Sequence, residues 1–166
     1  MEVIRPLYRN ALIEPVLIAL LIFQLATGVT MVLQGWRSRS GVVAWLQAVS
    51  GLYIAAFIVI HTTAVMGARF LLHLDTNFNF AAAGLHVPGW LWYFFPYYFL
   101  AVAALFAHVG CAIYWSFDDT RPRAASMALR VLIGVGVVSG VLFVLMLSGK
   151  LYPVTIPSKY LATYTG

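Results

Sequence analysis

Two histidines lie deep in uncharged, apolar stretches of this chain, and they are the residues best suited to chemistry. His61 lies in the uncharged run 41–68, and His108 lies in the uncharged run 76–117. Ionisable side chains inside such runs are rare and costly in lipid, so each is a candidate for function. A neutral imidazole is a common metal ligand. Two imidazoles at one depth can hold a single iron ion from opposite faces.

Helix geometry predicts how deep the two histidines lie. If the helices that carry them are antiparallel, His61 lies 12 residues from the loop end at His73, or about 18 Å. His108 lies 15 residues from Tyr93, near the start of the next helix, or about 22 Å. The imidazoles are therefore predicted to lie at similar depth. That is the arrangement of two axial ligands on the iron of one haem b.

The residues around His108 at helical spacing are small. Positions three, four and seven residues away include Ala101, Ala104, Cys111 and Ala112. A shallow face of this kind can accommodate a flat macrocycle. Small faces also allow close packing of membrane helices, and each histidine alone is better explained as a hydrogen-bonded structural residue. Only the pair favours a haem.

Two further polar residues belong to the candidate site. Arg69 lies two helical turns beyond His61, about 12 Å along the axis, where a guanidinium can pair with an anionic haem propionate. The same side chain can equally extend its charge toward lipid headgroups. His73 and His86 bracket the loop between the second and third predicted helices, and we include His73 among the cofactor-binding candidates.

The composition places these residues in a membrane. Of the 166 residues, 63% are apolar and 9% are charged, whereas soluble domains carry about 25% charged residues. This excludes a soluble enzyme, a disordered chain and a nucleic-acid-binding module. The single cysteine, Cys111, excludes an internal disulfide and a four-cysteine zinc or iron–sulfur site.

Four long apolar stretches predict an all-α integral membrane protein with a four-helix bundle. A membrane-spanning helix needs about 20 apolar residues. The stretches predict helices at roughly 13–33, 42–73, 91–117 and 127–150, within a single membrane domain over 1–166. The first stretch is too long for a cleaved signal peptide, so we expect it to be retained. The ten basic residues divide five and five between the two sides, so they do not orient the chain.

Three further segments are predicted to contact lipid, a small molecule or a neighbour. An aromatic group at the start of the third helix is typical of an interfacial belt, with a wall for a quinone ring as the alternative; it comprises Trp90, Trp92, Tyr93, Tyr97 and Tyr98. The loop 75–89 is long enough to contact a quinone or a soluble partner. The segment 152–157 contains two prolines, which predict an extended tail lying on a neighbouring subunit.

Several kinds of active site are absent from the sequence. The four histidines, at positions 61, 73, 86 and 108, include no pair at a spacing of three or four residues. This excludes zincin motifs and the paired histidines of membrane di-iron enzymes. No serine or cysteine lies in a recognisable nucleophile motif, and no glycine-rich phosphate loop is present. We therefore expect no enzyme active site in this chain alone.

One stretch resembles a known family. Ser50-Gly51, nine mostly apolar residues and then His61 resemble the second helix of succinate dehydrogenase/fumarate reductase-type cytochrome b membrane anchors. The resemblance covers residues 47–69 well, and a histidine in the third helix more loosely. It implies a membrane subunit that holds a flavoprotein and an iron–sulfur subunit. It also implies electron transfer to or from quinone through haem b, with His61 and His108 as ligands.

The chain also departs from that family pattern. Di-haem members supply four histidines from their helices, and their second and third helices generally ligate different haems. Here the first and fourth predicted helices contain no histidine, with Gln24 and Thr27 in the middle of the first. The sequence therefore allows at most one haem with two histidine ligands. Some members of the family bind no haem at all.

These observations favour a haem b-binding membrane subunit of a respiratory electron-transfer complex. We expect it in a bacterial inner membrane or an equivalent one, with lipid, quinone and other subunits as partners and no nucleic acid. The alternative is a cofactor-free structural or assembly subunit of a larger membrane complex. A small transporter is a weaker hypothesis, because few polar residues line the predicted spans and no paired broken helices appear.

Overall fold

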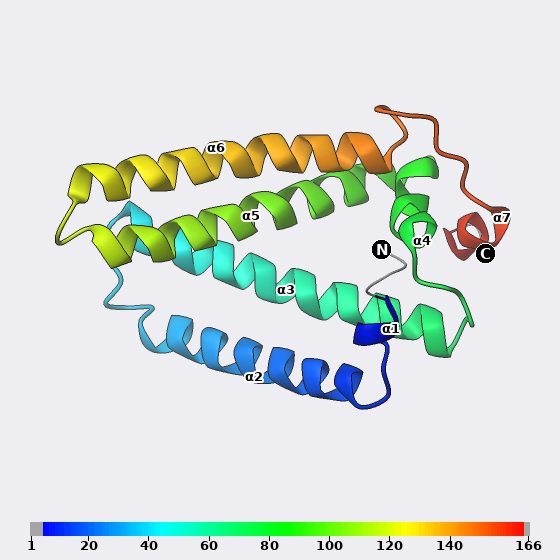
Figure 1. The fold of residues 1–166 in the computed structure, drawn as a ribbon, viewed down its shortest axis with the longest axis horizontal. Helices are drawn as coiled ribbons and strands as arrows, with labels where there is room; N and C mark the ends of the chain where they lie inside the picture. Colours follow the sequence, from blue (N-terminus) through cyan, green and yellow to red (C-terminus); the bar gives the residue numbers. More distant parts are fainter. Residues whose placement is uncertain (1–4, 165–166) are drawn as a thin grey trace. The chain divides into compact units, whose positions relative to one another are not determined.

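The computed structural model describes residues 5–164, and these residues form helices and connecting segments without any β-strand (Figure 1). The chain divides into two compact units, residues 1–40 and residues 41–166. Four of the helices are long and apolar enough to cross a membrane. The protein is therefore a multi-pass, all-helical integral membrane protein, as the sequence predicts.

The first unit contains one short helix and one long helix. Helix α1 spans Arg5–Tyr8, and α2 spans Ile13–Gln34. No residue of α2 is buried, and its sequence is apolar on every side, as in a helix that faces lipid or other membrane helices. The Thr27 and Thr30 hydroxyls donate hydrogen bonds to carbonyls of the preceding turn, which satisfies both groups within an apolar helix.

The second unit is built on three long helices. Helix α3 spans Val42–Phe70, α5 spans Leu91–Phe117 and α6 spans Pro122–Leu147. Helix α5 packs against both α3 and α6 and lies between them (Figure 1). Short helices gather at one end of this unit. They are α4 (Phe78–Ala83), the 3₁₀ helix η1 (Gly84–His86), α7 (Ser158–Leu161) and the 3₁₀ helix η2 (Ala162–Tyr164).

The predicted helix boundaries need two corrections. Helix α3 ends at Phe70 rather than at His73, whose positive φ of 52° is not helical. Helix α6 runs from Pro122 to Leu147 rather than from 127 to 150. A proline is well suited to the first position of a helix, because its fixed φ is helical and the missing N–H would have no partner there. Arg123 consequently belongs to α6.

Glycines bring α5 and α6 close together. A Cβ atom added at Gly136 would lie 2.6 Å from Cβ of Phe106, and one added at Gly140 would lie 3.0 Å from the Phe99 carbonyl oxygen. The first distance is shorter than real Cβ contacts reach and the second is tighter than most, so Gly136 requires a residue without a side chain and Gly140 favours one. Gly136 and Gly140 thus permit the close helix contact that their spacing predicts.

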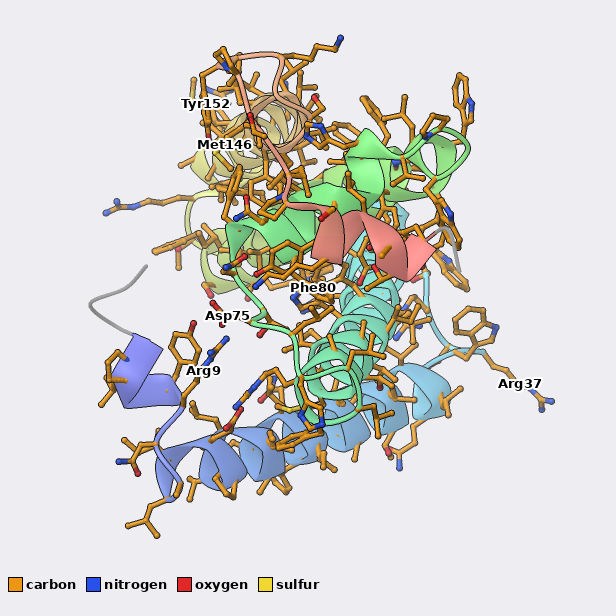
Figure 2. The ribbon with its side chains drawn as sticks, turned by 90° about the vertical axis from the view of Figure 1, so that its right-hand side faces the viewer. Arg9, Arg37, Asp75, Phe80, Met146 and Tyr152 are labelled. Carbon is orange, nitrogen blue, oxygen red and sulfur yellow. The ribbon has the colours of Figure 1, made fainter. Side chains whose placement is uncertain are left out.

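The short helices form a cap over one end of the second unit, which Figure 2 views end-on with Phe80 of α4 and Met146 of α6 labelled. The Asn77 side chain accepts hydrogen bonds from the backbone N–H groups of Asn79 and Phe80 and so starts α4. Residues 151–157 have an extended course back toward α4, as the prolines predict. The segment does not simply project toward a neighbouring subunit, because Ile156 and Tyr160 are buried in this chain's own core.

Candidate functional site

His108 is held by hydrogen bonds to α3. Its Nδ1 atom lies 3.0 Å from the backbone carbonyl oxygen of Gln47 and 3.2 Å from Oγ of Ser50. A carbonyl oxygen can only accept, so Nδ1 carries the hydrogen and donates it to Gln47. In the neutral ring, Nε2 then has a free lone pair. Metal-ligating histidines have this arrangement, but it is also an ordinary interhelical hydrogen bond.

Gly51 provides the space for this imidazole. A Cβ atom added at Gly51 would lie 2.9 Å from Cε1 and 3.2 Å from Nδ1 of His108. Any side chain at position 51 would therefore displace the ring. The adjacent small residue, Ser50, is buried and donates its own hydroxyl hydrogen to the Gln47 carbonyl at 3.1 Å. The Ser50-Gly51 pair thus forms the seat of the α5 histidine.

The polar contacts between α3 and α5 continue from His108 toward the C-terminus of α5. The indole N–H of Trp115 donates to Oε1 of Gln47 at 2.9 Å. The thiol of Cys111, which is fully buried, lies 3.7 Å from the Val43 carbonyl oxygen as a weak donor. The N-terminal half of α3 is therefore fixed to the C-terminal half of α5 by several hydrogen bonds.

His61 has a different environment. Its half-buried ring stacks on Phe57, with ring centroids 5.2 Å apart and planes 10° apart. Phe57 in turn packs on Tyr97 of α5, with centroids 4.7 Å apart. The His61 ring makes no hydrogen bond within residues 5–164. It is part of an aromatic stack rather than a polar cluster.

The prediction that His61 and His108 lie at one depth is wrong. His108 contacts Gly51, and His61 lies ten residues further along α3, about 15 Å away along the axis. Two axial ligands of one iron must approach it from opposite sides at the same level. The structure therefore does not fit one haem held between these two histidines of the same chain. That either histidine ligates a haem iron together with a residue of another chain stays a prediction.

The other two predicted site residues do not converge on either histidine. The guanidinium of Arg69 lies over the ring of the adjacent Phe70 at 5.5 Å and 4.0 Å from the Met66 sulfur. His73 is exposed beyond the end of α3, with the positive φ that ends the helix. Within the described part of the chain, no three histidine, cysteine or acidic residues are grouped so as to hold a metal ion.

His86, which the sequence gives no specific role, fixes the cap to α6. Its Nε2 donates a hydrogen bond to the Leu147 carbonyl oxygen at 3.0 Å. Leu147 is the last residue of α6, and the final carbonyls of a helix have no partner within the helix itself. His86 therefore caps the C-terminus of α6 and has a structural role.

The aromatic residues at the start of α5 mainly form a packed cluster. Tyr98 is 6% exposed and donates its hydroxyl hydrogen to the Ala81 carbonyl of α4 at 3.1 Å. Phe94 stacks near Tyr98 and packs edge-on against Tyr164 of the C-terminal segment. Trp92, by contrast, is 84% exposed, as an interfacial aromatic would be. The expected belt therefore applies to Trp92, whereas Tyr98 belongs to the core.

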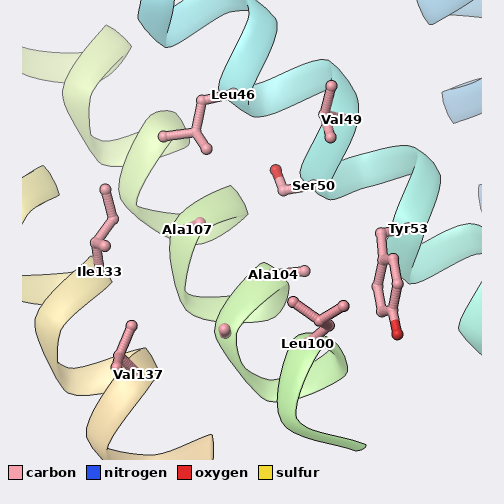
Figure 3. Close-up of a pocket in the computed structure, with 10 residues that line it drawn as sticks. Leu46, Val49, Ser50, Tyr53, Leu100, Ala104, Ala107, Ile133 and Val137 are labelled. Atoms are coloured by element: carbon pink, nitrogen blue, oxygen red, sulfur yellow. The ribbon is translucent and has the colours of Figure 1, made fainter. Parts of the chain in front are cut away.

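A groove lies on the surface of the three long helices, and Ser50 is one of the residues that line it. It has a volume of about 360 Å³ and is lined by residues of α3, α5 and α6 (Figure 3). Small residues of α5, Ala103, Ala104 and Ala107, line its middle. The sequence indicates the small residues around His108, but it does not indicate that α3 and α6 diverge over α5.

Sequence reasoning missed the contribution of the C-terminus. Tyr160 is 2% exposed and lies in the same buried cluster as Ala82, Ala83 and Tyr98. The signals available were the aromatic residues at 160 and 164 after a proline-rich segment. Those signals do not identify the packing partner, because that depends on how the loop 71–90 folds.

Comparisons with known proteins found no relative of this chain. No family model, no curated protein and no solved structure matches it.

Proposed function

We propose that this chain is the membrane-embedded subunit of a respiratory-type electron-transfer complex related to succinate dehydrogenase/fumarate reductase. In such a complex it would anchor a flavoprotein and an iron–sulfur subunit in a bacterial inner membrane or an equivalent one. Electrons would pass between those subunits and a quinone in the bilayer. The chain itself would supply the membrane scaffold rather than an active site.

The observation that supports this proposal most directly is the seat of His108. The two small residues of the family-like Ser50-Gly51 pair are the ones that accommodate the α5 imidazole. This connects the second-helix motif with the third-helix histidine, which are the two elements of the resemblance. The different depths of His61 and His108 also agree with the family pattern, in which these two helices ligate different haems.

Haem b enters the proposal only with a second ligand from outside this chain. When bound, haem b would carry single electrons between the partner subunits and quinone. The Nδ1 hydrogen bond to Gln47 fixes the His108 tautomer and leaves the Nε2 lone pair for such a role. His61 would lie at a separate level, near the aromatic cluster, where a quinone ring could stack.

The test is isolation of the complex from native membranes. The full-length chain is tagged, extracted in mild detergent and analysed for partner subunits, flavin, iron and a reduced-minus-oxidised absorption spectrum. We expect flavin- and iron-containing subunits to co-purify and to reduce or oxidise a soluble quinone analogue. Co-purification of subunits without any redox centre would contradict the proposal.

The haem part is tested separately by His61→Ala and His108→Ala variants of the same complex. If His108 ligates haem b together with a residue of another chain, His108→Ala should remove the α-band, whereas His61→Ala should leave it in place. Loss of the α-band in both variants would instead show that the two histidines share one haem, contrary to their offset of about 15 Å along α3. Absence of the band in both the natural protein and the variants would leave the electron-transfer anchor without haem.

A second candidate function is a cofactor-free structural or assembly subunit of a larger membrane complex. The observation that favours it is α2, a membrane-length helix without a buried side chain in its own unit. Helices of other subunits could cover such a surface. Stable co-purification with partners that contain no flavin, iron or haem would favour this function over electron transfer.

A further inference from the structure

The groove between α3 and α6 has an almost entirely apolar lining. Its walls come from residues such as Leu46 on α3 and Ile133 and Val137 on α6 (Figure 3). Only two lining residues carry hydroxyl groups. Ser50 donates to the Gln47 carbonyl, and Tyr53 donates to the Tyr97 carbonyl at 3.1 Å. The groove therefore suits an occupant that makes no hydrogen bonds there, such as a hydrocarbon chain.

Two arginines continue the groove along α6 toward the membrane surface. Arg123, Arg130 and Val137 are spaced by seven residues, or two helical turns, so they follow one line along the helix. Arg130 lies one turn before Ile133, at the end of the groove. Helical side chains point toward the helix N-terminus, so the Arg130 guanidinium extends away from the groove toward the α5–α6 turn.

The charges at this end favour an anion. Arg123 and Arg130 are both exposed, and neither forms an ion pair within the described part of the chain. The N-terminus of α6 adds the positive end of a helix dipole. The nearest carboxylates along the chain, Asp118 and Asp119, precede Arg121 in the turn between α5 and α6. The three arginines of this region outnumber the two aspartates.

We propose that this surface binds an anionic phospholipid. One acyl chain would lie in the groove between α3 and α6, and the phosphate headgroup would pair with Arg130 and Arg123. A basic site above an apolar groove between membrane helices has the charge pattern that complements such a lipid. The proposal does not depend on the electron-transfer function.

The experiment measures lipid preference of the full-length protein reconstituted in phosphatidylcholine bilayers. Spin-labelled phosphatidylglycerol and spin-labelled phosphatidylcholine are compared for the fraction immobilised at the protein surface. Each arginine near an anionic surface contributes about 1 kcal/mol, which corresponds to about a 5-fold preference. We expect phosphatidylglycerol to be preferred by about 5-fold or more. Equal immobilisation of both lipids would overturn the proposal.

Variants locate the site on the protein. Arg130→Gln should lower the phosphatidylglycerol preference about 5-fold, whereas Arg130→Lys should largely retain it. Arg121→Gln removes an arginine that precedes α6, and it serves as the charge control with a smaller expected effect. An unchanged preference in Arg130→Gln, in protein with an unaltered circular dichroism spectrum, would contradict the proposed headgroup site.

Filling the groove tests the acyl-chain part. Ala104→Leu places additional volume in the groove, and it should reduce immobilisation of both labelled lipids at this site. The matched control is Val109→Leu, which adds volume at an exposed position of α5 outside the groove lining. If Ala104→Leu behaves like Val109→Leu, the chain does not lie in the groove. That result would overturn the proposal.

Discussion

The two ends of the α3–α5 pair are held together by different interactions. At one end, His108 and Trp115 of α5 donate hydrogen bonds to the backbone and side chain of Gln47 on α3. At the other end, Phe57 of α3 packs among the rings of Tyr97 and Tyr98. The stability of the first end depends on the direction of its hydrogen bonds and on the tautomer of His108. The stability of the second end depends on the fit and the contact area of its aromatic rings.

This difference explains why two histidines in similar sequence contexts have different surroundings. Each lies in an apolar helix with small or aromatic neighbours. His108 meets a backbone carbonyl and a glycine across the helix interface, so it is fixed in one orientation. His61 meets a phenyl ring on its own helix and stacks on it. The partner helix, rather than the local sequence, decides which of the two behaves as a polar anchor.

The largest effect is expected from Gly51→Val, which breaks the hydrogen-bonded end. The new side chain would collide with the His108 ring, and overpacking of this kind costs about 1–3 kcal/mol. We expect a clear drop in the apparent Tm of the protein in detergent, measured by tryptophan fluorescence. The control is Gly67→Val on the same helix, where a Cβ meets no atom within 4 Å. Equal destabilisation by both variants would show that the seat of His108 does not matter.

The second-largest effect is expected when His108→Ala is compared with His61→Ala. His108→Ala removes a hydrogen bond worth about 1 kcal/mol together with the packing against Gly51. His61→Ala removes one ring stack, worth about 0.5–1.5 kcal/mol, at a half-buried position. Thermal unfolding in the same detergent should therefore give a lower Tm for His108→Ala. The reverse order would contradict the contrast between the two ends.

A smaller effect is expected within the aromatic end. Tyr98→Phe keeps the ring but removes the hydroxyl that donates to Ala81, at a cost of about 1 kcal/mol because the carbonyl is left in a buried environment. Tyr53→Phe removes a comparable hydroxyl that donates to Tyr97 at a less buried position. Chemical denaturation should show a larger loss of stability for Tyr98→Phe. Equal losses of stability in the two variants would mean that burial of the hydrogen bond between Tyr98 and Ala81 does not increase its contribution to stability.

The smallest effect concerns the pH dependence of the cap. Burial, together with the nearby Tyr93, raises the pKa of the Tyr164 hydroxyl above its usual value near 10. Below pH 10 the folded and unfolded forms are both neutral, so this group has no effect. Above pH 10 the unfolded form ionises first and binds fewer protons, so stability falls as the pH rises. Between pH 8 and 11, the free energy of unfolding should decline less in Tyr164→Phe than in the natural protein. An identical decline in both would show that ionisation of Tyr164 does not contribute to the loss of stability.

The sequence by itself determined the membrane-spanning architecture. Charge is so sparse that each long gap between charged residues contains a helix of membrane length, and α2 and α5 begin at the predicted residues. The errors in the four predicted spans lay at the ends of helices, where proline and backbone conformation decide. The fourth helix begins earlier than predicted because Pro122 can occupy its first position.

Only the tertiary structure decided the register of α3 against α5. Hydropathy is a local property of the sequence. It indicates that a residue lies in the bilayer, but it does not indicate which residue of the next helix lies beside it. The loop 71–90 contains α4 and η1, and its sequence does not specify how residues of α3 and α5 line up beside one another. The register follows instead from the fit of His108 against Gly51, which places His61 about 15 Å away along α3. That fit depends on contacts between residues far apart in the chain.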